Sequence, residues 1–254
     1  MIKRNELVDF LDSTLDLPGF RNDVSNNGLQ VEGGENIERI LFGVDACQEL
    51  FDAAIETKAQ FIFVHHGISW GGGLKRFTGL NARRLSSLFN NGISLYAAHL
   101  PLDAHPLYGN NAALADMTGL LERKPFFEYS GVNIGVSGTL PAPGTLDEIA
   151  SIFAENLEVD PVLRGDAEKV IKSVAIVSGG GGQDAIFAAK DAGCDLLITG
   201  EMEHVMHHTA LELGVSIIAL GHYASETTGP LAMQKLIGET FEVETLFAEI
   251  PTGL

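Results

Sequence analysis

The chain has 254 residues, of which 45% are hydrophobic and 20% are charged, a composition that is typical of globular proteins and excludes a disordered one. Its formal net charge of −18 repels a phosphate backbone, so we expect no nucleic-acid binding through a broad basic surface. Two cysteines exclude both a disulfide framework and a cysteine-rich zinc site.

The first half of the chain alternates apolar runs with amphipathic stretches. Apolar runs predict strands over residues 38–45, 60–64 and 93–98. Amphipathic stretches predict helices over residues 48–58, 82–91 and 110–118. No apolar run is long enough to span a membrane, and the N-terminal stretch lacks the apolar core of a signal peptide. We therefore predict a cytoplasmic protein.

The second half repeats this alternation after a boundary near residues 120–130. We predict strands over 132–138, 172–178, 195–199, 215–220 and 241–248, with a helix over 146–157. Continuous apolar strands separated by helices are typical of sheets that are covered on both faces. The predicted fold is therefore α/β, with two similar lobes whose mixed sheets are flanked by helices. Lobe 1 covers residues 1–125 and lobe 2 covers 126–254, with the C-terminal segment either in lobe 2 or returning to lobe 1.

Two segments, one in each half, follow the same plan. GISLYAAHLPLD (92–103) has a glycine, an apolar strand, and then His99 and Asp103 four residues apart. GVSIIALGHYASE (214–226) has the same order, with His222 and Glu226 four residues apart. We interpret this similarity as two similarly built lobes that face each other. Chance similarity between α/β segments is the alternative.

Polar side chains follow several of the predicted strands, at the carboxyl ends where open α/β sheets carry their sites. These side chains are His65, His66, His99, Asp103, Glu201, His222 and Glu226. Histidine and carboxylate ligands without cysteine suit zinc, iron or manganese. We therefore predict a site for divalent metal ions, with a purely structural cluster of polar side chains as the alternative.

The adjacent pair of histidines indicates more than one ion. Neighbouring residues of a strand point to opposite faces, so His65 and His66 can each bind a different ion. A carboxylate can bridge two ions through its two oxygens, and Asp103 or Glu226 can take this role. Two ions held in this way would share a hydroxide, which would act as the nucleophile of a hydrolase.

Several motifs resemble, in the same order, those of the Ngg-interacting-factor-three-like family, whose bacterial members are commonly named GTP cyclohydrolase I type 2 homologues. The motifs are FVHHGISW (63–70), LYAAHLPLDAHPLYGNNAAL (95–114), TGEMEHVMHH (199–208) and GHYASE (221–226). NNGLQVEG (26–33) and the glycine-rich turn after residues 174–178 match as well. The resemblance covers nearly the whole chain.

The resemblance implies two α/β lobes with a dinuclear metal site between them, and assembly into a ring-like homohexamer. The ligands that it implies are His65, His66, Asp103, His222 and Glu226. It implies catalytic or supporting roles beside the site for His99 and Glu201. The expected cofactors are two divalent metal ions per chain.

The leading hypothesis for function is a metal-dependent hydrolase of a small heterocyclic or phosphorylated metabolite. A nucleotide is one candidate substrate, and the resemblance implies ring opening of GTP. Glu201 or His99 would move protons. Two alternatives stay open: a protein that stores, delivers or senses metal without turnover, and a ring-shaped scaffold. The turn SGGGG (178–182) either holds a substrate phosphate at a helix N-terminus or is a tight strand-to-helix turn.

Overall fold

The computed structural model describes all 254 residues, and they divide into two compact units. Unit 1 comprises Met1–Leu102 and Gly229–Ile250, and unit 2 comprises Asp103–Thr228 and Pro251–Leu254. The sequence-based boundary near residue 125 lies later than this border. Residues 103–125 fall in unit 2 because α5 (Asn110–Met117) packs against the strands β8 (Val132–Gly144) and β10 (Ile171–Val177).

Unit 1 combines one larger sheet with helices on both of its faces. Its elements are β1 (Ile2–Lys3), α1 (Arg4–Thr14), a 3-10 helix (Leu17–Phe20), β2 (Gly28–Val31), β3 (Asn36–Ile37), β4 (Arg39–Asp45), α2 (Gln48–Thr57), β5 (Phe61–His66), α3 (Leu80–Asn90), β6 (Ser94–Ala97), α10 (Thr228–Thr240) and β13 (Glu244–Phe247). The short helix α4 (Leu100–Ala104) contains the border residues.

The five-stranded sheet of unit 1 has the order β13-β4-β5-β6-β2. Strands β13, β4, β5 and β6 run parallel, and β2 lies antiparallel to β6 at the edge. The register pairs Asp45 at the end of β4 with His66 at the end of β5. The carboxyl ends of these two strands therefore place a carboxylate and an imidazole side by side.

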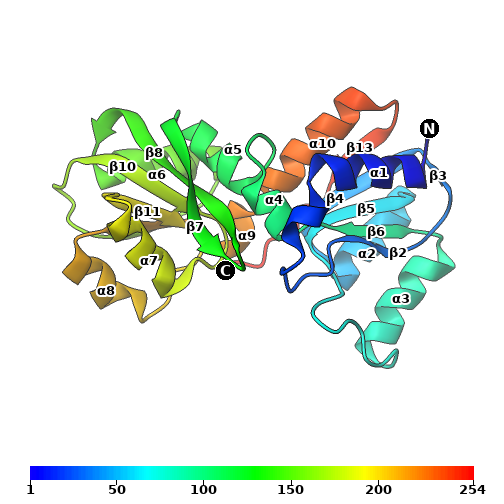
Figure 1. Cartoon of the computed structure of the whole chain (residues 1–254). Helices are drawn as coiled ribbons and strands as arrows, with labels where there is room; N and C mark the ends of the chain where they lie inside the picture. The colour runs from blue at the N-terminus through cyan, green and yellow to red at the C-terminus, as the bar shows by residue number, and fades with distance from the viewer. The chain divides into compact units, whose positions relative to one another are not determined.

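Alternation along the central strands of unit 1 supplies an apolar residue to each face of the sheet. Ile62 and Val64 pack into the core that α2 and α3 cover. Phe61 and Phe63 stack on the ring of Tyr96 on the opposite face. Figure 1 shows α1 and α10 on one side of this sheet and α2 and α3 on the other. β5 is therefore packed on both faces up to its final histidine pair.

Unit 2 is built around a six-stranded sheet. Its remaining elements are β7 (Leu121–Tyr129), α6 (Leu146–Leu157), β9 (Val162–Arg164), α7 (Gly182–Asp191), β11 (Leu196–Thr199), α8 (Met206–Leu213), β12 (Ser216–Ala219) and α9 (His222–Ser225). The strand order is β7-β8-β10-β11-β12-β9, with β10, β11 and β12 parallel and the other pairings antiparallel. Helices α5 and α6 bury their apolar side chains on one face, and α7 and α8 pack against β10, β11 and β12.

The two units share one plan, which confirms the predicted fold class. In each unit, three parallel strands are each followed by a helix: β4, β5 and β6 in unit 1, and β10, β11 and β12 in unit 2. An antiparallel strand pairs with the third of them in both, β2 in one and β9 in the other. The sequence did not predict β7, because it is a largely exposed edge strand that buries only Phe126 and therefore shows no apolar alternation.

Asp195 links the starts of two central strands in unit 2. Its carboxylate accepts hydrogen bonds from the backbone amides of Lys172 and Ser173, at 3.1 Å each, and from the Ser173 hydroxyl at 2.9 Å. Burial alone would raise the pKa of Asp195, but these hydrogen bonds and the ammonium of Lys169 hold it below the ordinary value.

We expect Asp195→Asn to lower the free energy of unfolding by about 1 kcal/mol at neutral pH, because all three bonds end on Oδ2 and a neutral amide oxygen accepts them more weakly than a charged carboxylate oxygen. A depressed carboxyl pKa stabilises the fold above the unfolded-state pKa and loses that effect as pH falls through the folded-state pKa. Urea unfolding at several pH values should therefore show a constant difference above about pH 5 that shrinks below about pH 4. A difference that grows on acidification would contradict this account of Asp195.

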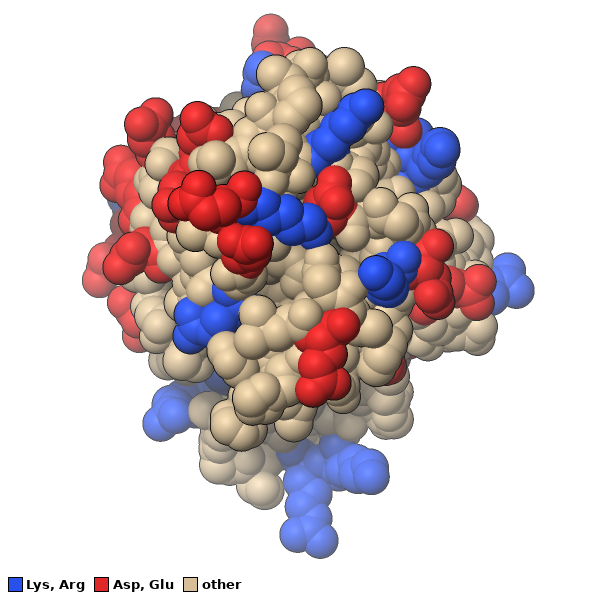
Figure 2. All heavy atoms as spheres, turned by 90° about the vertical axis from the view of Figure 1, so that its left-hand side faces the viewer, with Lys and Arg blue, Asp and Glu red and all other residues tan.

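The sequence predicted neither a membrane-spanning segment nor a broad basic surface. No helix combines the length and the apolar composition needed to cross a membrane. On the face that Figure 2 shows, Lys and Arg side chains are scattered among Asp and Glu side chains, which gather along one edge. This face carries no continuous basic surface of the kind that binds a phosphate backbone.

Candidate metal centre

Unit 1 brings three histidines together at the carboxyl ends of β5 and β6. His65 is fully buried, His66 ends β5, and His99 follows β6. The ring centroids of His65 and His66 are 4.5 Å apart, and those of His65 and His99 are 5.2 Å apart. One ligand nitrogen from each of the three lies within 4.8 Å of the other two, so this group could hold a metal ion.

The histidine pair at the end of β5 is anchored through the Nδ1 atoms. Nδ1 of His65 lies 2.9 Å from the backbone carbonyl oxygen of Ala98, and Nδ1 of His66 lies 2.9 Å from Oδ1 of Asp45. Because both partners are acceptors, Nδ1 donates and the neutral ring keeps its lone pair on Nε2. Metal-binding histidines are commonly oriented in this way.

The two rings lean towards opposite neighbours of β5, since Ala98 follows β6 and Asp45 ends β4. Their anchors therefore lie on the two sides of β5 within the sheet, while the ring centroids stay 4.5 Å apart. That His65 and His66 bind different ions stays a prediction.

His99 is held by a loop that lies far away in the sequence. Its Nδ1 donates to Oδ1 of Asp23 at 2.9 Å, and its backbone amide donates to Oδ1 of Asn27 at 2.8 Å. Burial alone would raise the pKa of Asp23, but hydrogen bonds, first that from His99, hold it below the ordinary value. The indole of Trp70 packs edge-on against His99 with the ring centroids 5.1 Å apart. The imidazole of His99 is thus fixed from two sides.

The first residue of unit 2, Asp103, is a buried aspartate. Asp103 is only 6% exposed, and its Oδ1 accepts hydrogen bonds from Nδ2 of Asn110 at 2.9 Å and from the Ser178 hydroxyl at 3.0 Å. The first residue of α5 and the residue after β10 therefore fix the orientation of this carboxylate.

Unit 2 also carries a histidine between two glutamates. Nδ1 of His222 donates to Oε1 of Glu201 at 2.6 Å, and its Nε2 lies 3.1 Å from Oε2 of the buried Glu226. The hydrogen bond to Glu226 raises the pKa of His222 to about 9, with Glu201 adding to the rise and burial opposing it. A metal ion that binds Nε2 would displace the proton that this carboxylate stabilises.

The glycine-rich turn after β10 packs directly against Glu226. Gly179 has a φ of +61°, and a Cβ at this position would overlap Oε1 of Glu226. The amide of Gly179 donates to the Ser225 hydroxyl at 3.0 Å, and the amide of Gly181 donates to the Thr199 hydroxyl at 3.4 Å. These contacts support the tight-turn alternative, because two amides of the turn already donate to side chains of α9 and β11.

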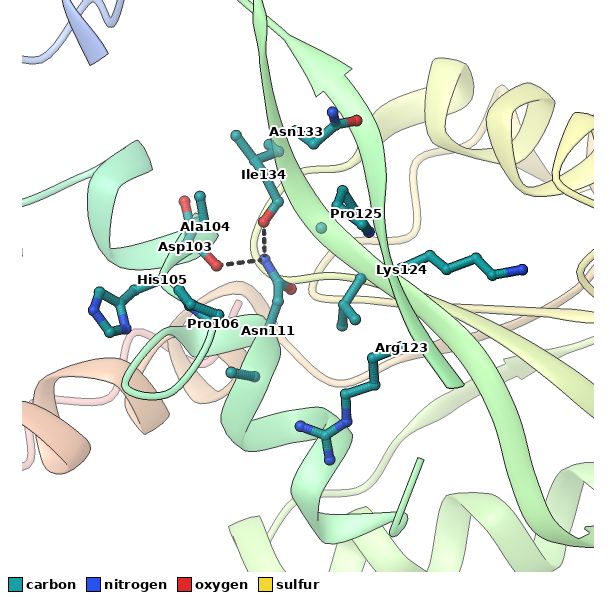
Figure 3. A pocket seen from close by; sticks show the side chains of 13 residues that line it. Asp103, Ala104, His105, Pro106, Asn111, Arg123, Lys124, Pro125, Asn133 and Ile134 are labelled. Carbon is teal, nitrogen blue, oxygen red and sulfur yellow. Dashed lines mark hydrogen bonds between the residues drawn. The ribbon is translucent and has the colours of Figure 1, made fainter. Parts of the chain in front are cut away.

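A cavity of about 210 Å³ lies beside Asp103, between the start of α5 and the strands β7 and β8 (Figure 3). Nδ2 of Asn111 donates to the backbone carbonyls of Asp103 at 3.2 Å and Ile134 at 2.8 Å. Most of the other lining is apolar, from Ala104, Pro106, Ala112, Pro125 and Val136. The cavity can take a small organic group whose edge meets Asp103.

Comparison with known proteins identifies the family. The model of the family described as Duf34/NIF3 (NGG1p interacting factor 3) matches residues 2–252. The chain belongs to this family. A relative from Pyrococcus abyssi, named GTP cyclohydrolase 1 type 2 homolog, is 47% identical over 256 residues, which cover 100% of both chains.

Solved structures of other proteins agree with this membership of the Duf34/NIF3 family. The structure of protein ybgI, described as of unknown function, has a TM-score of 0.92 at 36% identity. That of TTHA1606 from Thermus thermophilus has a TM-score of 0.89 at 36% identity. Both comparisons cover 100% of each chain.

The structure of this Duf34/NIF3 chain sorts the predicted site residues into two sets. The first set, in unit 1, is His65, His66 and His99. The second set, in unit 2, is Asp103, Glu201, His222 and Glu226. Within the second set, Asp103 and Glu226 contact successive residues of one turn, Ser178 and Gly179.

Sequence reasoning missed the side chains that orient these groups. Asp45 ends a strand that was predicted at 38–45, so the rule that found His66 at a strand end could have found it too. Asp23 lies in a loop without an apolar pattern and gave no such signal. Ser178 precedes the glycines of a turn that was interpreted only as a backbone feature.

Proposed function

We propose that this chain binds two divalent metal ions and uses them to hydrolyse a small metabolite. The proposed ligands are His65, His66, Asp103, His222 and Glu226. The observation that carries the proposal is that the three histidines of this set all anchor Nδ1 on an oxygen, which leaves Nε2 as the nitrogen for a metal ion, in His222 after loss of the proton that faces Glu226.

The donor set fits borderline to hard divalent ions. It combines imidazole nitrogens with carboxylate oxygens and contains no thiolate, which suits zinc, iron or manganese. Ions of this kind polarise a substrate oxygen and lower the pKa of water. The buried carboxylates Asp103 and Glu226 would balance the positive charge that such ions bring.

The path of the chain supports one shared centre. The chain passes from unit 1 to unit 2 between Leu102 and Asp103, so His99 lies just before this passage and Asp103 directly after it. It passes back between Thr228 and Gly229, just after Glu226. We propose on this ground that the two sets of side chains belong to one dinuclear centre.

The cavity beside Asp103 favours an enzyme over a protein that only stores metal. A storage site needs a complete ligand shell, whereas a catalytic site needs space for a substrate next to the ligands. A volume of about 210 Å³ with mostly apolar walls, to which Arg123 and Lys124 add positive charge, suits a ring-sized group. The name of the relatives points to GTP, so a nucleotide is our candidate substrate, and the ring-like hexamer is proposed from the family resemblance.

The two predicted proton carriers receive different roles. Glu201 accepts a hydrogen bond from Nδ1 of His222, and we therefore assign it the orientation of that ligand. Asp23 orients His99 by accepting a hydrogen bond from Nδ1. Nε2 of His99 then carries the lone pair and can accept a proton. We propose that His99 moves the proton during hydrolysis.

The experiment that tests this function compares metal-loaded and metal-depleted protein on nucleotides, phosphomonoesters and phosphodiesters. We expect turnover of at least one substrate class only in the loaded protein, and we expect His99→Gln to lower it by about 10²–10⁴-fold with its metal retained. Glu212→Gln, on the exposed side of α8, is the matched control and should be as active as the wild type. Turnover that survives metal removal would contradict the proposal, and full metal occupancy without turnover of any class would favour metal storage.

A further inference from the structure

The Asp23 carboxylate is surrounded by hydrogen-bond donors from its own loop and from the chain around His99. Its Oδ1 accepts from the backbone amide of Ser25 at 3.0 Å and from Nδ1 of His99 at 2.9 Å. Its Oδ2 accepts from Nδ2 of Asn27 at 2.8 Å and from the backbone amide of Leu100 at 3.0 Å. The side chain is completely buried. A carboxylate is the side chain that matches these four donors, because it offers acceptors only.

The contact with the Asp23 carboxylate determines which nitrogen of His99 carries the proton. Nδ1 of a neutral imidazole that faces a carboxylate must donate, so the lone pair is confined to Nε2. The backbone amide of His99 donates separately to Oδ1 of Asn27, which fixes the position of the His99 backbone. The ring is therefore fixed in both its tautomer and its position.

Gln30, in the strand β2 that follows this loop, contacts the chain after the other two histidines. Oε1 of Gln30 accepts from the backbone amides of Ile68 at 2.8 Å and Ser69 at 3.0 Å. Gly67, directly after His66, leaves room for this contact, since a Cβ there would overlap the amide group of Gln30. The segment from Asp23 to Gln30 thus contacts both stretches of chain that carry the histidines of unit 1.

We infer that Asp23 is a positioning residue of the site, which acts through His99 by confining it to the tautomer protonated on Nδ1. The NNGLQVEG motif (26–33) then serves as the frame that supports this pair, rather than as a substrate-binding loop. The inference deepens the proposed function, because it rests on the role given there to His99. If Asp23 had a purely structural role, it would stabilise the fold, and either tautomer of His99 would be compatible with that role.

The test is a long-range ¹H–¹⁵N correlation spectrum of the full-length, zinc-loaded protein labelled with ¹⁵N-histidine, recorded at about pH 8, where an ordinary histidine is neutral. His99→Gln assigns the His99 signals. We expect protonated-type Nδ1 and unprotonated-type Nε2 signals for His99 in the wild type. Asp23→Asn should remove the Nδ1–H signal of His99, because its amide group cannot accept all four bonds.

Asp45→Asn is the matched control, since Asp45 makes the corresponding contact with His66. It should change the signals of His66 and leave those of His99 unchanged. Wild-type His99 protonated on Nε2, or an unchanged Nδ1–H signal in folded Asp23→Asn, would overturn the inference. The wild-type spectrum decides the matter even if the variant does not fold. This readout needs no turnover, so the inference and the proposed function can fail separately.

Discussion

Asp103→Asn and Glu226→Gln are each expected to lower the affinity for divalent metal by more than about 100-fold. Both substitutions keep the volume of a buried side chain and remove only the charge that would balance the ions. Loss of a ligand should exceed the 10–100-fold loss that is usual for residues that merely orient a ligand. Metal titration followed by elemental analysis after dialysis measures the effect.

The control for these two variants is Glu212→Gln, an equal change of charge at an exposed position of α8. It should bind metal as the wild type does. Wild-type affinity in both Asp103→Asn and Glu226→Gln would show that these carboxylates are not ligands.

Gly179→Ala is expected to damage both the fold and the metal site. Gly179 has a φ of +61°, which costs an alanine about 1 kcal/mol, and the new Cβ would also overlap the carboxylate of Glu226. Overlap with a well-packed group adds about 1–3 kcal/mol. We therefore expect the free energy of unfolding to fall by about 2–4 kcal/mol in urea titration, together with weaker metal binding.

Gly214→Ala separates the two causes. Gly214 has a similar φ of +69° at the C-terminal end of α8, and nothing lies within 4 Å of the position that a Cβ would take there. The free energy of unfolding of Gly214→Ala should fall by about 1 kcal/mol, from the backbone conformation alone, and its metal affinity should stay unchanged. Equal losses in the two variants, with metal binding intact in both, would rule out the contact between Gly179 and Glu226 as the cause.

The sequence predicted the parts of the site that depend on local patterns. Apolar runs that stop at polar residues located His65, His66, His99 and His222 at strand ends, because a buried strand needs an uninterrupted apolar pattern. The same periodicity predicted the central strands of both sheets. These features are properties of short segments, so a single sequence contains them.

Features that depend on distant pairing were not predicted from local patterns. Asp23 and His99 are 76 residues apart, and only the folded chain brings them into contact. Asp45 meets His66 through the register of β4 and β5, which the pattern of either strand alone does not define. The border between the units fell after Leu102 because α5 packs on strands that come later in the chain.

The metal content of the protein shows whether this member of the Duf34/NIF3 family binds two divalent metal ions. The measurement is elemental analysis of the wild-type protein after incubation with zinc, iron or manganese and removal of unbound metal. We expect about two ions per chain of at least one of these metals. A chain that retains none of them would contradict it.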